Sequence, residues 1–209
     1  MYVVPVGKFY VDSPKIQREI VNTGATEVEI RVVDPREVSK TQRRKARAII
    51  GDIANWNGDP PDWLHGYFKD RFCTIYDIES FSLRDTDMTT ARLYISYLID
   101  FCLYHSVPLK KPILELCDDV KRALYSCLCH KKCVVCGVGA QLHHVDHVGM
   151  GRNREKIVHE GMKVQPLCAV HHAECHQIGQ SVFDDNHHLE SVVLDKYLCI
   201  KYGVNCKAD

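Results

Sequence analysis

Residue types that bind metals are concentrated toward the C-terminal end of the sequence. Of the 12 histidines and 11 cysteines in the 209 residues, 10 histidines and 8 cysteines lie from Cys127 onward. The first residues, MYVVPVGKFYVDSP, contain no apolar stretch of signal-peptide length, so we expect a cytoplasmic protein. Disulfides are rare in that compartment, and an odd number of cysteines cannot all pair. Metal binding is therefore the chemistry to consider first.

Two short ligand pairs have the spacing of a structural zinc site. Cys133 and Cys136 form a Cys-x-x-Cys-Gly turn, and Cys168 and His171 form a Cys-x-x-His pair further along the chain. Such turns let two side chains bind one tetrahedral Zn²⁺, so the two pairs together predict a closed Cys3His site. The alternative is four ordinary buried side chains, because free cysteine is often buried. The reserve ligands are Cys175, Cys127 and Cys129.

Further histidines remain once zinc has its four ligands. His172 and His176 are four residues apart, so a helix after Cys168 would place both rings on one face. His143 and His144 are adjacent, and neighbours on an extended strand point to opposite sides. One of them can then bind a cation while the other takes a proton from a water molecule, as a one-metal hydrolytic site requires. The alternative is that these histidines serve the zinc site or the surface.

The segment from Cys133 to Gly179 resembles the HNH, or ββα-metal, nuclease family in its zinc-stabilised form. It closely resembles HNH nucleases encoded by bacteriophages. The resemblance implies that His144 is the general base and that His143 is the first ligand of a catalytic Mg²⁺ or Mn²⁺. It implies as well that the products of DNA cleavage carry a 5′-phosphate. It also implies the remaining ligands, which are His172 and His176 for the catalytic ion, and Cys133, Cys136, Cys168 and His171 for the structural zinc.

One position departs from the family pattern. The asparagine expected five residues before the third zinc ligand is Lys163 here, and Asn153 is a candidate to replace it. Because that asparagine braces the loop of the general base, the departure concerns loop geometry more than reaction class. A second register stays open, with Asp146 as a catalytic-site ligand and His147 as the base.

Two groups of basic residues are candidates for binding phosphates. Arg152 and Arg154 follow the histidine strand in the segment GMGRNR, where glycines allow close approach and guanidinium groups can bind phosphate oxygens. A predicted helix over residues 39–56 begins after Ser39 as N-cap and carries a second group. For both groups the alternative is a solvated charged surface. The helix presents Lys40, Arg43, Arg44, Lys45 and Arg47.

The rest of the chain predicts an α+β fold. Alternating apolar residues indicate strands at 2–6, 8–11 and 27–33, and helical spacing indicates helices at 15–22, 62–72, 89–105 and 113–130. Aromatic residues of the helix at 89–105 are expected in the core, and core packing is also favoured for Trp56 and Trp63. A final helix and strand are expected after Ser181.

The first 110 residues resemble the Orf (NinB) recombination-mediator family of lambdoid phages. Members of that family bind single-stranded DNA and assist a phage recombinase. The resemblance is carried by Ser39, Gln42, Arg44, Lys45, Gly51, Asp52, Trp56, Trp63, Phe68, Phe81, Ser82, Tyr97 and Phe101.

Together these features predict a small mixed strand and helix domain joined to a zinc-stabilised ββα-metal domain. The predicted boundaries are 1–110 for the Orf/NinB-like DNA-binding domain, 111–130 for a connecting helix and 131–209 for the HNH nuclease domain. With 27 basic and 27 acidic residues, any nucleic-acid site must be local. No apolar run approaches the roughly 18–20 residues that span a bilayer, so no membrane partner is expected.

The expected function is a metal-dependent DNA endonuclease of phage recombination or replication, acting in the host cytoplasm on single-stranded or branched DNA. The alternative is a non-catalytic, zinc-containing mediator that binds single-stranded DNA. A homing-type endonuclease with a long duplex site is a third hypothesis. Expected protein partners are a phage recombinase, a host single-strand-binding protein and a second copy of the chain.

Overall fold

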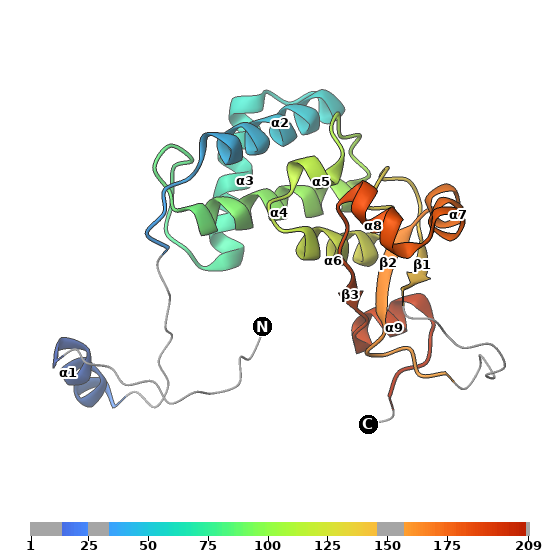
Figure 1. Ribbon diagram of the computed structural model, residues 1–209. Coiled ribbons are helices and arrows are strands. Elements are labelled where there is room, and N and C mark those ends of the chain that lie inside the picture. Colours follow the sequence, from blue (N-terminus) through green and yellow to red (C-terminus); the bar gives the residue numbers. More distant parts are fainter. Residues whose placement is uncertain (1–13, 25–33, 146–156, 208–209) are drawn as a thin grey trace. The chain divides into compact units, whose positions relative to one another are not determined.

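The computed structural model describes residues 14–24, 34–145 and 157–207 (Figure 1). The chain divides into two units, Met1–Val33 and Asp34–Asp209. Within the described residues the fold is mixed α+β, as predicted, with nine helices and one three-stranded sheet. No helix in these ranges has both the length and the apolar character needed to pass through a bilayer. The strands predicted at 2–6, 8–11 and 27–33 lie outside the described residues.

The helices predicted in the first half of the chain are confirmed. Helix α1 (Pro14–Thr23) belongs to the first unit, and α2 (Lys40–Asn57), α3 (Pro61–Tyr76) and α4 (Met88–His105) belong to the second. The predicted N-cap of α2 is also confirmed. The Ser39 hydroxyl accepts a hydrogen bond from the Gln42 backbone N–H, and the Gln42 side chain accepts one from the Ser39 N–H, each at 3.0 Å. This reciprocal capping satisfies two N–H groups that the first turn would otherwise leave unpaired.

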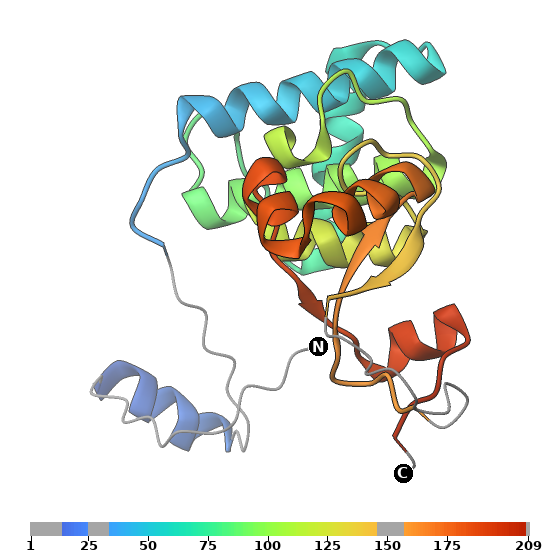
Figure 2. The ribbon, with the colours of Figure 1, turned by 45° about the vertical axis from the view of Figure 1, so that its right-hand side comes forward.

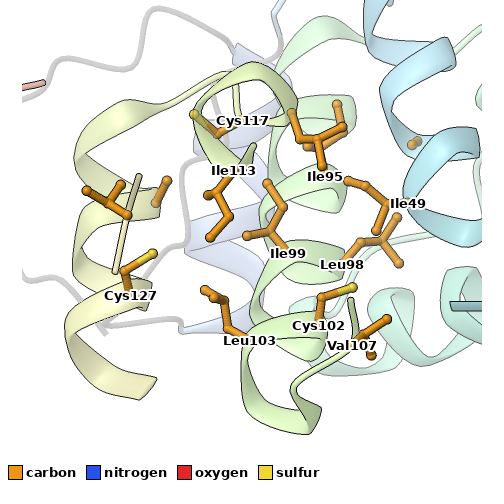
Figure 3. Packing of buried hydrophobic residues seen from close by; sticks show 14 of the residues in the cluster. Ile49, Ile95, Leu98, Ile99, Cys102, Leu103, Val107, Ile113, Cys117 and Cys127 are labelled. Carbon is orange, nitrogen blue, oxygen red and sulfur yellow. The ribbon is translucent and has the colours of Figure 1, made fainter. Parts of the chain in front are cut away.

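Helix α4 forms the centre of the main core. Figure 3 shows its residues Ile95, Leu98 and Ile99 packed between Ile49 of α2 and Cys127 of α6 (Val120–His130). The same core continues into the zinc-ligand region through Val134, Leu167, Cys175, Phe183 and Leu189. The predicted boundaries at 110 and 130 stay a prediction, but this core contains residues from both sides of them.

The single helix predicted over 113–130 is wrong, because the chain forms two helices there. Helix α5 (Ile113–Leu116) ends at Cys117, whose backbone is extended, and α6 (Val120–His130) begins after Asp119. The Asp119 carboxylate accepts a hydrogen bond from the Arg122 backbone N–H at 3.0 Å, which caps the new helix. A residue of α2 also stabilises the break between the two helices, since Lys45 Nζ donates to the Cys117 carbonyl at 2.8 Å.

The sheet and the last helices form the other side of the second unit (Figures 1 and 2). Strands β1 (Gln141–His144), β2 (Lys163–Leu167) and β3 (Val192–Val193) are antiparallel in that order. Helices α7 (Ala169–Ile178) and α8 (Gln180–His187) lie between β2 and β3 in the sequence, and α9 (Lys196–Tyr202) follows β3. The region after Ser181 therefore contains more secondary structure than the single helix and strand predicted.

Helix α6 joins the two sides of the second unit. It packs against α4 on one side, and on the other against β2, β3 and α9. A second, smaller apolar cluster lies between α6 and the elements β2, β3 and α9. In it, Leu128 of α6, Val164 of β2 and Leu198 of α9 are fully buried. The sheet therefore packs against α6 through the face opposite the one that carries the His143 side chain.

The two tryptophans do not lie in the core, so that expectation is wrong. Trp56 is 44% exposed and Trp63 is 56% exposed. Trp63 instead stacks on Tyr67 of the same helix, with ring centroids 5.2 Å apart. Helical spacing does not distinguish these positions, because an aromatic pair four residues apart can stack on the surface as well as in the interior.

Candidate metal and catalytic site

The four predicted zinc ligands lie together. The Sγ atoms of Cys133, Cys136 and Cys168 and one ring nitrogen of His171 are all within 4.8 Å of one another. Cys136 Sγ is 3.7 Å from Cys168 Sγ, and Cys133 Sγ is 3.6 Å from His171 Nδ1. Ligands of a tetrahedral Zn²⁺ would lie about 3.5–3.8 Å apart, given zinc–ligand distances of about 2.0–2.3 Å. The cluster therefore fits a zinc ion.

Local backbone structure brings the two pairs together. Gly137 has a φ of +75°, and its N–H donates to the Cys133 carbonyl at 2.7 Å, which closes the turn between Cys133 and Cys136. Cys168 is the N-cap residue of α7, so its thiol lies at the first turn of the helix that carries His171. The Val134 N–H donates to the Pro166 carbonyl at 3.2 Å and holds the turn against β2.

The thiols of the cluster differ in acidity. Burial raises the pKa of Cys133 to about 11. Burial acts in the same direction on Cys168, but hydrogen bonds from the His171 backbone and ring and from Cys136 outweigh it and bring the pKa to about 7. A buried thiol such as Cys133 becomes a thiolate when a metal replaces its proton, so it is suited to a structural ion.

Strand β1 points its two histidines in opposite directions. His143 pairs with Gln165 of β2 and His144 pairs with Val164. His143 is 3% exposed and faces α7 and α8, where its ring centroid lies 4.6 Å from that of His172. His144 lies on the other side of the strand. This is the alternation expected from an extended backbone.

His143, His172 and His176 form a second cluster. One nitrogen from each ring lies within 4.8 Å of the other two, and the ring centroids of His172 and His176 are 4.8 Å apart. The helical spacing of these two residues on α7 produces this proximity. The predicted catalytic trio is therefore brought together by β1 and α7.

The trio fits a cation in its chemistry as well as its geometry. Among the described residues, the buried Nδ1 atom of His143 has no hydrogen-bond partner. A buried nitrogen without a partner is costly, and a metal ion is one group that satisfies it. Burial lowers the pKa of His143, and burial together with the neighbouring His143 and His176 lowers the pKa of His172. Both rings are therefore biased toward the neutral form that binds metals.

His144 has a partner that the sequence did not indicate. Its Nε2 atom lies 2.8 Å from Nδ1 of His159, with the ring centroids 4.8 Å apart. The backbone N–H of His159 donates to the Asn205 carbonyl at 2.9 Å, and the Asn205 amide donates to the Ile157 carbonyl at 3.2 Å. Asn205, which follows α9, thus braces the loop that carries His159. His159 is 15 residues away from His144, so no local spacing in the sequence indicates this contact.

Other predicted residues are not members of these two clusters. Lys163, at the family's asparagine position, begins β2 and is exposed, while its carbonyl accepts from the Val145 N–H at 2.9 Å. The reserve ligand Cys175 is buried with Sγ 3.6 Å from His143 Nε2, and Cys127 lies in the main core. The third reserve ligand, Cys129, packs against the smaller apolar cluster. Five further predicted residues lie outside the described ranges, and they are Asp146, His147, Arg152, Asn153 and Arg154.

The basic residues of α2 have different surroundings. Lys45 Nζ forms an ion pair with Asp118 at 2.6 Å, in which both side chains are less than one-fifth exposed. This contact pairs the Lys45 charge within the fold, and the phosphate contact of Lys45 stays a prediction. Arg43 donates to the Arg84 carbonyl at 3.1 Å, and Arg44 is exposed.

Strands β1 and β2 are antiparallel and are followed by α7, and these elements with the N-cap residue of α7 carry two of the four predicted zinc ligands and the whole histidine trio. Comparison with protein-family models found a match over residues 10–201 to the family described as "Putative HNHc nuclease". The match covers most of the chain, and the protein belongs to this HNH nuclease family. Comparisons with curated proteins and with solved structures found no significant match.

Proposed function

We propose that the protein is a metal-dependent DNA endonuclease that hydrolyses phosphodiester bonds. The observation that supports this most strongly is the division of β1. His143 joins His172 and His176 on one side, and His144 lies on the other side beside His159. A divalent cation such as Mg²⁺ or Mn²⁺, when bound, would stabilise the charge that develops on the leaving oxygen. Three neutral imidazoles that bound this ion would leave its positive charge available to the phosphate.

His144 is the proposed general base. To accept a proton from water at Nδ1, it must carry its own proton on Nε2. That N–H then donates to His159 Nδ1 across the observed 2.8 Å, which orients the ring. A base oriented by a second group through the far nitrogen is the arrangement that enzymes use to hold an imidazole in one tautomer.

DNA is the proposed substrate, with single-stranded or branched character. Arg152 and Arg154 keep their predicted role at the phosphate next to the histidine strand. On α2, exposed Arg44 is proposed to contact a more distant phosphate, whereas the Lys45 charge is paired within the fold. Because the sequence resembles phage enzymes, we propose that the protein acts in the host cytoplasm during phage recombination or replication. The proposed partners are a recombinase, a single-strand-binding protein or a second copy of the chain.

One observation favours the alternative of a non-catalytic mediator. Trp56 and Trp63 are exposed, and the Trp63–Tyr67 stack offers a flat aromatic face on α3. Aromatic faces of this kind bind single-stranded bases with little sequence preference. This surface is compatible with an endonuclease that also binds single strands, so cleavage has to be measured directly.

The test is DNA nicking with a variant of the histidine trio. His176→Ala should lower Mn²⁺-dependent nicking of supercoiled DNA by at least about 100-fold, because even the loss of a residue behind a metal ligand costs roughly 10–100-fold. The matched control is His65→Ala on α3, a histidine that lies outside both clusters, and it should nick like the wild type.

The outcomes separate the two functions. Wild-type cleavage that stops in metal-free buffer and in the His176 variant supports the endonuclease. If the wild type binds a single-stranded oligonucleotide but cleaves no supercoiled, single-stranded or branched DNA at high protein and Mn²⁺ concentration, the mediator function is correct. Equal cleavage by the wild type and His176→Ala would remove the trio from the mechanism.

A further inference from the structure

A buried polar network lies directly behind His143. Gln165 of β2 is opposite His143 in the sheet and is fully buried, and Gln180 and Asp184 lie one turn apart on α8. These three side chains are joined by hydrogen bonds of 2.7–3.0 Å. None of them belongs to either ligand cluster, and nothing in their spacing along the chain singles them out.

The network has only one consistent arrangement of donors. The Gln180 amide nitrogen faces two acceptors, Gln165 Oε1 at 3.0 Å and Asp184 Oδ1 at 2.9 Å. The Gln165 amide nitrogen faces Asp184 Oδ1 at 2.7 Å and the Glu190 carbonyl at 2.9 Å. A carboxylate has no hydrogen to donate, so both amide NH₂ groups must point toward Asp184. Turning the Gln180 amide around would place its oxygen against two other oxygens.

The orientation of Gln180 determines the tautomer of His143. With its nitrogen turned toward Asp184, Gln180 presents Oε1 to His143 Nε2 at 2.8 Å. Cys175 Sγ donates to the same oxygen at 3.4 Å. Because an amide oxygen can only accept, His143 Nε2 must carry the hydrogen. The lone pair of the ring is then on Nδ1, the buried atom that has no hydrogen-bond partner among the described residues.

We propose that Gln180, held by Gln165 and Asp184, is a positioning residue that fixes His143 as the Nε2–H tautomer and so prepares Nδ1 to bind the catalytic cation. The proposal rests on the proposed metal-dependent function. It assigns a role to α8, which would otherwise only close the domain. Hydrogen bonds behind metal ligands fix tautomer and ring orientation in many metal sites, and here neutral amides connect the ligand to a carboxylate.

The experiment compares Gln180→Leu and Gln180→Glu with a matched control, Gln177→Leu. Leucine removes the acceptor and both donors at nearly constant volume. Glutamate keeps an acceptor for His143 but places a second carboxylate against Asp184. Gln177 is exposed in the last turn of α7, so its replacement should change nothing. Zinc content and thermal melting of each variant show that the fold is kept.

The first measurement is the tautomer of His143, read from ring ¹⁵N chemical shifts in zinc-loaded protein without Mn²⁺. The wild type and Gln177→Leu should show only the Nε2–H form, and Gln180→Leu should show a mixture. A wild-type His143 that carries its proton on Nδ1 would overturn the proposal, and so would a Gln180→Leu spectrum identical to that of the wild type. Since no catalytic metal is present, this measurement stands even if the proposed endonuclease function fails.

The second measurement is Mn²⁺ affinity by calorimetry. Gln180→Leu should bind Mn²⁺ about 10–100-fold more weakly than the wild type. Gln180→Glu keeps the acceptor for His143, so it should bind Mn²⁺ more tightly than Gln180→Leu does. Zinc content should be unchanged in both variants. Nicking should recover as Mn²⁺ is raised, because Gln180 acts through the metal ligand His143. A Gln180→Leu variant that binds Mn²⁺ as tightly as the wild type would contradict the proposal, whereas a wild type that binds no Mn²⁺ would contradict the proposed function instead.

Discussion

Replacing Cys133 with serine should unfold the region from residue 133 onward and weaken the whole second unit. Binding free energy at a structural zinc is folding free energy, and it reaches about 10–16 kcal/mol in zinc-finger peptides. A domain is stable by only about 5–15 kcal/mol in total, so the loss cannot be absorbed locally. The neighbouring Val134 and the β2 residue Leu167 belong to the main core, which spreads the effect to α4 and α6.

The measurement is circular dichroism melting with zinc content determined on the same samples. Strong chelation of the wild type should reproduce the effect of Cys133→Ser. The control is Cys73→Ser on α3, a thiol outside the zinc cluster, which should melt like the wild type and keep its zinc. Unchanged melting after complete removal of zinc would show that these four residues do not stabilise the fold.

His144→Ala should lower the cleavage rate by about 10²–10⁴-fold, the range associated with a positioned general base. Mn²⁺ affinity, zinc content and DNA binding should stay as in the wild type, because His144 lies on the opposite side of β1 from the histidine trio. This combination separates a base from a ligand, since His143→Ala should lose Mn²⁺ affinity as well as rate. Single-turnover nicking of supercoiled DNA at saturating Mn²⁺ measures the rate.

Replacing the partner of the base provides a graded comparison. His159→Ala should slow cleavage less than His144→Ala does, because it removes orientation and leaves the proton acceptor in place. If His144→Ala cleaves as fast as the wild type, the assignment of His144 is wrong. The register with Asp146 as ligand and His147 as base would then be the one to test by His147→Ala.

The ligand pairs were accessible from the sequence because they depend on local spacing, whereas the choice of His143 as ligand and His144 as base came from the family resemblance. A Cys-x-x-Cys turn, a Cys-x-x-His start to a helix and two histidines four residues apart each place their side chains together without any knowledge of the rest of the fold. The opposite directions of His143 and His144 follow in the same way from strand geometry. Only the closure of each cluster needed the pairing of β1 with β2.

Features that depend on distant contacts were missed. The partner of His144 is 15 residues away at His159, and the oxygen that faces His143 comes from Gln180 on a separate helix. The break between α5 and α6 depends on Lys45, whose side chain binds a carbonyl 72 residues further along the chain. The exposure of Trp56 and Trp63 reflects which faces of α2 and α3 the core leaves uncovered. The spacing of residues within one segment indicates neither these distant contacts nor which helix face is exposed.

Anomalous diffraction from crystals of the zinc-loaded protein soaked in Mn²⁺ tests the central claim most directly. Data at the zinc and manganese edges should locate two separate ions. One should be a zinc bound by Cys133, Cys136, Cys168 and His171 at about 2.0–2.3 Å, and the other a manganese bound by His143, His172 and His176. A single ion shared between the clusters, or manganese bound away from all three histidines, would contradict the separation of structural and catalytic metal sites.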